Sequence, residues 1–193
     1  KYKKFNSEEF DEILIKSVES RLVSDVDVGI FLSGGLDSSI ITSVAKNLGN
    51  NIKSYTLGFN EDSYDESKKA KFVSDSLEIK NEKFIIDEND LNDIDKIILS
   101  FGEPIADTSI IPTYFLSKFA SKKTKVCLGG DGGDELFFGY DTYTASRTYD
   151  ILKNFKTGYL FKNLKFLKNY LPMKKTKVNY FYAIQRFIES FDD

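Results

Sequence analysis

Histidine is absent from this 193-residue sequence, which contains a single cysteine and no long apolar run. The absence of histidine excludes Ser-His-Asp catalysis, histidine-ligated zinc and haem held by histidine. With Cys127 alone, an internal disulfide is excluded, and we expect this thiol to belong to the core. A membrane-spanning helix needs roughly 20 apolar residues, and a secretory signal needs an apolar core after its basic residues. Neither pattern occurs, so we expect a cytoplasmic protein without a membrane partner.

Acidic residues outnumber basic ones over residues 1–150, whereas the C-terminal part of the chain is basic. The sequence contains 27 basic and 30 acidic residues, whereas residues 151–193 contain 9 basic and 3 acidic ones. A basic segment rich in aromatic residues can bind nucleic acid. Here the apolar residues recur at helical spacing with lysines opposite, which favours amphipathic helices that pack on protein. We therefore expect no nucleic-acid partner, and we interpret residues 151–193 as a truncated helical continuation of a domain formed by residues 1–150.

The rest of the sequence alternates short apolar runs with helical patterns. The segments between the apolar runs repeat their apolar residues with a period near 3.6. This alternation predicts an α/β fold with a parallel, doubly wound sheet and right-handed crossovers. The expected strands are 28–32, 52–57, 81–86 and 125–128. The expected helices are 1–24, 38–48, 65–77, 90–101 and 111–122.

The first segment that carries chemistry is VGIFLSGGLDSS at residues 28–39. An apolar strand runs directly into two glycines and three serines at the start of a helix. Glycine allows the backbone to approach a ligand closely, and the free N–H groups of a helix start attract anions. The pattern therefore predicts a phosphate-binding loop. The loop is not of the Walker type, because the pattern GxxxxGK[ST] and its lysine are absent.

A second glycine-rich segment, GGDGGDE at residues 129–135, follows the last expected strand. Ligands of parallel sheets bind at the carboxyl ends of the strands, so we expect both glycine-rich loops to line one edge. Carboxylates that face a phosphate chain need a cation between them. We therefore predict that Asp37 and Asp134 hold Mg²⁺ against bound phosphates. Asp107, in the segment 103–109, is either part of a capped loop or a substrate ligand.

Four segments in order resemble the synthetase domain of the glutamine-hydrolysing (B-type) asparagine synthetase family. They are RLVSDVDVGIFLSGGLDSS, SYTLGF, EPIADTSIIPTYFLS and GGDGGDELFFGY, and they lie within residues 21–149. More broadly, SGGxDS is similar to the PP-loop of the N-type ATP pyrophosphatases. The resemblance implies a five-stranded parallel sheet of the adenine-nucleotide α-hydrolase-like kind, with C-terminal helices.

The resemblance also implies a reaction and its ligands. The side-chain carboxylate of aspartate attacks the α-phosphorus of ATP, magnesium pyrophosphate leaves, and ammonia from an N-terminal glutaminase domain displaces AMP from the acyl-adenylate. By position, Asp131 would lie near the adenylate and the ammonia as the catalytic residue, Leu57 would contact adenine, and Asp37 and Asp134 would bind Mg²⁺. The residues that the resemblance assigns to ATP are Leu32, Ser33, Gly34, Gly35, Asp37, Ser38, Leu57, Gly129 and Gly130.

Departures from the family's pattern leave alternatives open. Asp131 stands where better-known members have glutamate, and the glutaminase with its terminal cysteine is missing. Because the sequence starts at Lys1, we interpret it as an excised synthetase portion. The same chemistry on another carboxylate, such as a sugar acid in surface-polysaccharide synthesis, and an ATP-binding module without turnover are both alternatives. Asp37, Asp131 and Asp134 favour an enzyme, and a homodimer is compatible with the sequence.

Overall fold

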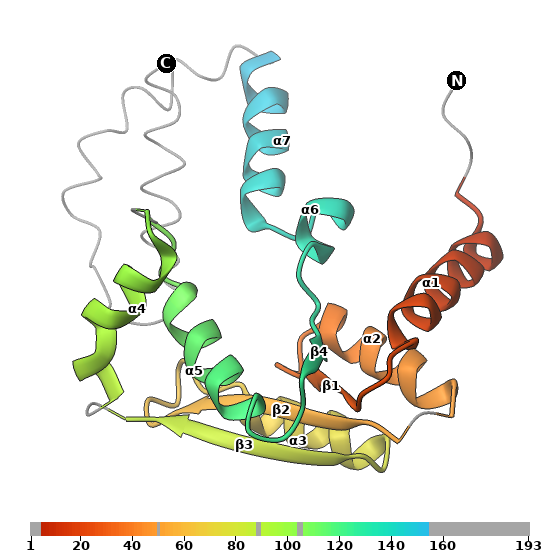
Figure 1. Ribbon diagram of the computed structural model, residues 1–193. Coiled ribbons are helices and arrows are strands. Elements are labelled where there is room, and N and C mark those ends of the chain that lie inside the picture. Colours follow the sequence, from red (N-terminus) through yellow and green to blue (C-terminus); the bar gives the residue numbers. More distant parts are fainter. Residues whose placement is uncertain (1–4, 50, 88–89, 104–105, 155–193) are drawn as a thin grey trace. The chain divides into compact units, whose positions relative to one another are not determined.

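The computed structural model describes residues 5–49, 51–87, 90–103 and 106–154 (Figure 1). The chain divides into two compact units, Lys1–Asp131 and Gly132–Asp193. The first contains a sheet with helices on both faces, and the described part of the second contains helices alone. The helical continuation expected at 151–193 lies outside the described residues from position 155 onward. None of the helices that the structure describes has the length and apolar character needed to cross a bilayer.

The sheet of the first unit is parallel throughout the described residues. Its strands are β1 (Val28–Phe31), β2 (Lys53–Phe59), β3 (Lys80–Ile86) and β4 (Val126–Leu128), in the order β3-β2-β1-β4. β1 pairs with β2 on one side and with β4 on the other. The predicted α/β class with a parallel sheet is therefore confirmed. The resemblance implied a five-stranded sheet, whereas the described residues supply four strands.

Helices cover both faces of this sheet. They are α1 (Ser7–Leu22), α2 (Leu36–Asn47), α3 (Ser67–Ser76), the 3₁₀ turn η1 (Asp90–Asp93), α4 (Ile94–Phe101) and α5 (Ile110–Ala120). On one face, α1 and α2 enclose an apolar cluster around the fully buried Ile30 and Ala45. On the other face, α4 and α5 pack on β2 and β3 through Ile97 and Phe115. Figure 1 shows α3 and α5 on opposite sides of β2 and β3.

Most element boundaries shift by a few residues from those expected, and two differences concern the site. β2 continues beyond position 57 to Phe59 because β3 pairs with it along its whole length. Gly58 consequently lies inside the strand. The glycine-rich segment 129–135 runs into a short helix, α6 (Gly133–Phe137), which α7 (Asp141–Asn154) follows. α7 thus passes through position 150, where the first domain was expected to end.

Candidate active site

The loop predicted to bind phosphate leaves the carboxyl end of β1 and leads into α2. Its first residue, Leu32, is buried. The N–H of Leu32 donates to the carbonyl oxygen of Tyr55 (N···O 2.9 Å), and the hydroxyl of Thr56 donates to the carbonyl oxygen of Leu32 (2.7 Å). Both partners belong to β2. The sheet therefore fixes the point at which the loop begins.

Serine hydroxyls fold this loop back on itself. Ser33 Oγ lies 3.0 Å from Ser38 Oγ and accepts the N–H of Gly35 (3.2 Å). The hydroxyls of Ser38 and Ser39 donate to the carbonyl oxygen of Gly35, at 3.3 and 2.6 Å. Gly35 is the N-cap of α2 and makes no side-chain cap hydrogen bond. Because the first N–H groups of a helix have no acceptor within the helix, this end of α2 is suited to bind an anion.

Gly34 and Gly130 bring two other segments against the loop. Gly34 has a φ of +78°, and a Cβ atom there would lie 2.5 Å from the backbone nitrogen of Ala70 in α3. Gly130 follows β4, and a Cβ atom there would lie 2.8 Å from the backbone nitrogen of Ser38 and 3.1 Å from the Cβ of Asp37. Only glycine allows such approaches. Since β1 and β4 are neighbours, residues 129–131 of the second glycine-rich segment lie at the same edge of the sheet as the first loop, as predicted.

The carboxylates expected in the site occupy three different positions. Asp37 is half-buried in the first turn of α2. Asp131 is exposed after β4, and its carboxylate turns back to Gly129. Asp134 is half-buried in the first turn of α6, in the second unit. Among the described residues no group of three or more His, Cys, Asp or Glu side chains could hold a metal, and shared binding of Mg²⁺ by Asp37 and Asp134 stays a prediction.

Two other candidates have structural roles. Leu57 lies within β2, opposite Phe84, and its side chain packs on the apolar cluster beneath α4 and α5, so contact with adenine stays a prediction. Asp107 Oδ1 accepts the N–H of Ser109 (2.8 Å) just before α5. This hydrogen bond, followed by one from the Ser109 side chain, lowers the pKa of Asp107. Asp107 therefore belongs to the hydrogen-bonded loop before α5, one of the two roles that the sequence offered, and Ser109 is the N-cap of that helix.

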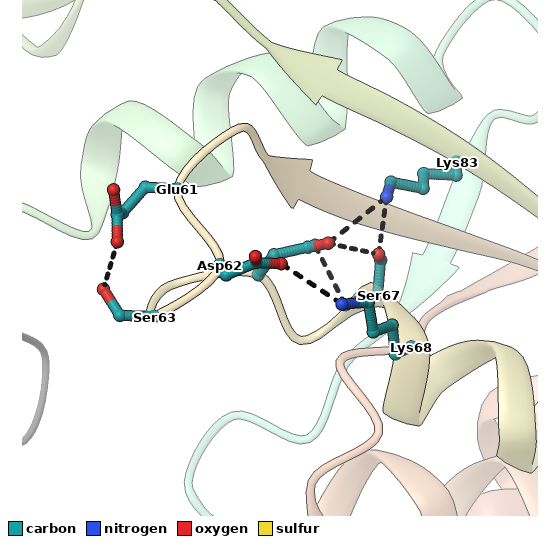
Figure 2. A network of polar contacts seen from close by, with 7 residues as sticks. Glu61, Asp62, Ser63, Ser67, Lys68 and Lys83 are labelled. Carbon is teal, nitrogen blue, oxygen red and sulfur yellow. Dashed lines mark hydrogen bonds and ion pairs between the residues drawn. The ribbon is translucent and has the colours of Figure 1, made fainter.

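A polar cluster that the sequence analysis missed lies at the start of α3. Asp65 accepts the N–H (3.1 Å) and the hydroxyl (2.8 Å) of Ser67, while Lys83 Nζ donates to Ser67 Oγ (2.6 Å) and lies 3.4 Å from Asp65 Oδ2 (Figure 2). Burial raises the pKa of Asp65, but the hydrogen bonds from Ser67 and the charge of Lys83 lower it further, to below its usual value. An aspartate two residues before a helix start was the local signal. Lys83 is 18 residues away in the sequence and gave no such signal.

Known proteins with similar sequences indicate one family of enzymes, which the following matches identify. The chain matches the asparagine synthase family model over residues 9–186. It is 43% identical over 136 residues to glutamine-hydrolysing asparagine synthetase 1 of Bacillus subtilis, and the match covers 70% of this chain and 22% of that protein. A homologue of the same enzyme in Methanocaldococcus jannaschii is 38% identical over 171 residues, covering 87% of this chain and 32% of that protein. The chain thus spans less than a third of the length of either relative.

A solved structure shares the fold. It is that of glutamine-dependent NAD+ synthetase from Acinetobacter baumannii, which aligns with a TM-score of 0.51 and 18% sequence identity. The alignment covers 72% of this chain and 28% of that one. At this identity the likeness concerns the fold alone, and it agrees with the parallel α/β sheet described above.

Proposed function

Because this chain belongs to the asparagine synthase family, we propose that it forms the ATP-binding synthetase part of an enzyme that converts a carboxylate to an amide. The observation that carries the proposal is the meeting of two glycine-rich segments at the carboxyl edge of the sheet. There Gly130 packs on the first turn of α2, directly after the loop that contains Gly34 and Gly35. A helix start with glycine backbone on both sides is suited to the phosphates of ATP.

In the proposed reaction, a carboxylate oxygen attacks the α-phosphorus of ATP. The bond from this phosphorus to the bridging oxygen breaks, pyrophosphate leaves, and an acyl-adenylate remains. Ammonia then attacks the acyl carbon, loses a proton and expels AMP, which leaves the amide. These steps depend on phosphate positioning and charge stabilisation more than on a nucleophilic side chain. A site without histidine is therefore sufficient.

Asp37 fits a magnesium site. Its half-buried carboxylate lies in the first turn of the helix that would receive the phosphates. Magnesium commonly takes one or two protein carboxylates together with phosphate oxygens, and when bound it neutralises the charge of the leaving pyrophosphate. We assign Asp37 and Asp134 to this role, and Asp131 to a position near the adenylate.

Aspartate is the proposed carboxylate substrate, and a glutaminase domain is the proposed source of ammonia. The name of the Bacillus subtilis relative, a glutamine-hydrolysing asparagine synthetase, supports both assignments. The substrate would bind beside Asp131. The experiment described next distinguishes aspartate from another carboxylic acid as the substrate.

Exchange of labelled pyrophosphate into ATP tests the proposal on the full-length protein. We expect exchange that requires both aspartate and Mg²⁺, because only formation of an acyl-adenylate makes pyrophosphate release reversible. Exchange with a sugar acid and not with aspartate would reassign the substrate. Binding of ATP without exchange, whatever carboxylate is offered, would identify a nucleotide-binding module and contradict the proposal.

Asp37→Asn tests the metal site in the same assay. We expect the Mg²⁺ concentration for half-maximal exchange to rise by about tenfold or more, because changes around a metal commonly cost that much affinity. Asp95→Asn is the matched control, since Asp95 lies in the first turn of α4 and is exposed. Unchanged magnesium dependence in Asp37→Asn would remove Asp37 from the metal site.

A further inference from the structure

A carboxylate at the start of α3 is held by several donors from three elements of the structure. Asp65 accepts two hydrogen bonds from Ser67, and the backbone of Phe59 in β2 adds another. Lys83 in β3 completes the set with an ion pair (3.4 Å). The side chain of Asp65 is only 9% exposed. Hydrogen bonds between charged and polar groups in such a shielded place are stronger than those on an open surface.

Gly58 makes room for this cluster on the sheet. A Cβ atom at position 58 would lie 2.9 Å from Lys83 Nζ and 3.1 Å from Asp65 Oδ1. The missing side chain therefore lets Lys83 cross β2 and reach Ser67 (Figure 2). As a result, the start of α3 is attached to both β2 and β3, and not only to the loop that precedes it.

The first turns of α3 in turn support the phosphate loop. A Cβ atom on Gly34 would lie 2.6 Å from the carbonyl carbon and the Cβ of Lys69, and 2.5 Å from the backbone nitrogen of Ala70. Ala70 is fully buried. Gly34 thus rests directly on the backbone of α3 in a left-handed conformation, two to three residues after Ser67.

We propose that Asp65 is a positioning residue for the phosphate loop. Through Ser67 and Lys83 it fixes the start of α3, and α3 holds Gly34 in the conformation from which the loop turns toward α2. Asp65 would act through Ser67, Lys83 and the backbone of α3, which makes it a positioning residue and not a catalytic one. This positioning role rests on the proposed function, because it assumes that the loop binds the phosphates of ATP. A loop held in its binding conformation loses less entropy when the nucleotide arrives.

The same segment offers a matched control. Asp62 lies three residues before Asp65 and pairs with Lys68 at 3.2 Å (Figure 2). Both side chains are more than 80% exposed. Exposed ion pairs of this kind contribute little to structure. Asp62→Asn therefore removes the same charge from the same segment without releasing the start of α3.

Calorimetric binding of Mg-ATP and of adenosine to the full-length protein tests the proposal. We expect Asp65→Asn to raise the Kd for Mg-ATP by about tenfold, as the loss of one charge-assisted hydrogen bond would. The Kd for adenosine, which lacks phosphates, should not change, and Asp62→Asn should change neither. Amide hydrogen exchange of residues 33–39 in the ligand-free protein should be faster in Asp65→Asn than in Asp62→Asn.

The outcomes distinguish failure of the positioning role of Asp65 from failure of the proposed ATP-dependent function. Wild-type Kd values and wild-type exchange in Asp65→Asn would overturn the positioning role and leave the proposed function intact. Absence of Mg-ATP binding by the wild type would contradict the proposed function, while hydrogen exchange would still test positioning. If Asp65→Asn does not fold, Lys83→Met carries the same test, because it removes the donor to Ser67 and keeps the carboxylate. Unchanged loop exchange in that folded variant would overturn the proposal.

Discussion

Gly29, Tyr55 and Cys127 form a contact between three adjacent strands. A Cβ atom on Gly29 would lie 2.6 Å from the ring of Tyr55 and 3.1 Å from the sulfur of Cys127, so the glycine lets both side chains lie across β1. Tyr55 is fully buried and packs edge-on against Phe119 of α5. Burial raises the pKa of Cys127 to about 11. The thiol is therefore uncharged at neutral pH, but it is only half-buried and does not belong to the buried core that the sequence predicted for it.

Cys127 should make stability fall at alkaline pH. A thiol whose pKa is raised on folding, here from 9.0 to about 11, stabilises the folded state fully below pH 9. That contribution is lost as the pH rises from 9 to 11. We expect the free energy of unfolding, measured with urea across this interval, to fall more steeply in the wild type than in Cys127→Ala. Parallel curves would contradict the assignment, because tyrosine and lysine titration is common to both proteins.

At the scale of elements, the N-terminus of α1 shows how a cap sets a boundary. Asn6 is extended, and its side-chain oxygen accepts the N–H of Glu8 (3.1 Å). The rings of Phe5 and Phe10 lie 5.8 Å apart across this turn, as in a hydrophobic staple. The helix was expected from residue 1, and this cap makes Ser7 its first residue.

Asn6→Ala should destabilise the protein by about 1 kcal/mol, the usual cost of losing an N-cap. The loss reaches the whole fold because α1 packs on the core through Val18. Urea unfolding measures the difference. Ser7→Ala is the control, and we expect it to change stability by less than about 0.5 kcal/mol. A larger effect of Ser7→Ala than of Asn6→Ala would contradict the assignment of the cap to Asn6.

At the scale of the whole molecule, the strand order determines which hydrogen bonds are best protected. Within the described residues, β1 and β2 each have a neighbour on both sides, whereas β3 and β4 each have one. β2 also contributes two of the four fully buried polar residues among those described, Ser54 and Thr56. Local opening is rarest where both edges of a strand are paired and covered.

Amide hydrogen exchange followed by mass spectrometry should therefore be slowest in β1 and β2. We expect peptides from residues 53–59 to keep their protons longer than peptides from 80–86, although the two strands are equally long. The physical reason is that β3 has one paired edge in the described sheet. Slower exchange in β3 than in β2 would contradict this strand order.

Much of this molecule follows from its sequence, because strands and helices are local patterns. The apolar run before Ser33 and the glycines after Leu128 predicted two loops, and the rules for parallel sheets placed both at one edge. The family resemblance rested on these two segments and on two others. Catalytic and metal roles for Asp37, Asp131 and Asp134 stay predictions, since residue type and order indicate a chemistry without fixing distances.

Only the tertiary structure decided the features that join distant segments. β2 extends to Phe59 because β3 supplies partners along its full length. Gly34 is required as glycine because α3, 35 residues further on, occupies the space of its side chain. The pairing of Asp65 with Lys83 has the same origin. A sequence pattern reports the preferences of neighbouring residues, whereas these contacts depend on how strands and helices pack. The phosphate loop was therefore predictable from the sequence, but the contact with α3 that supports it was not.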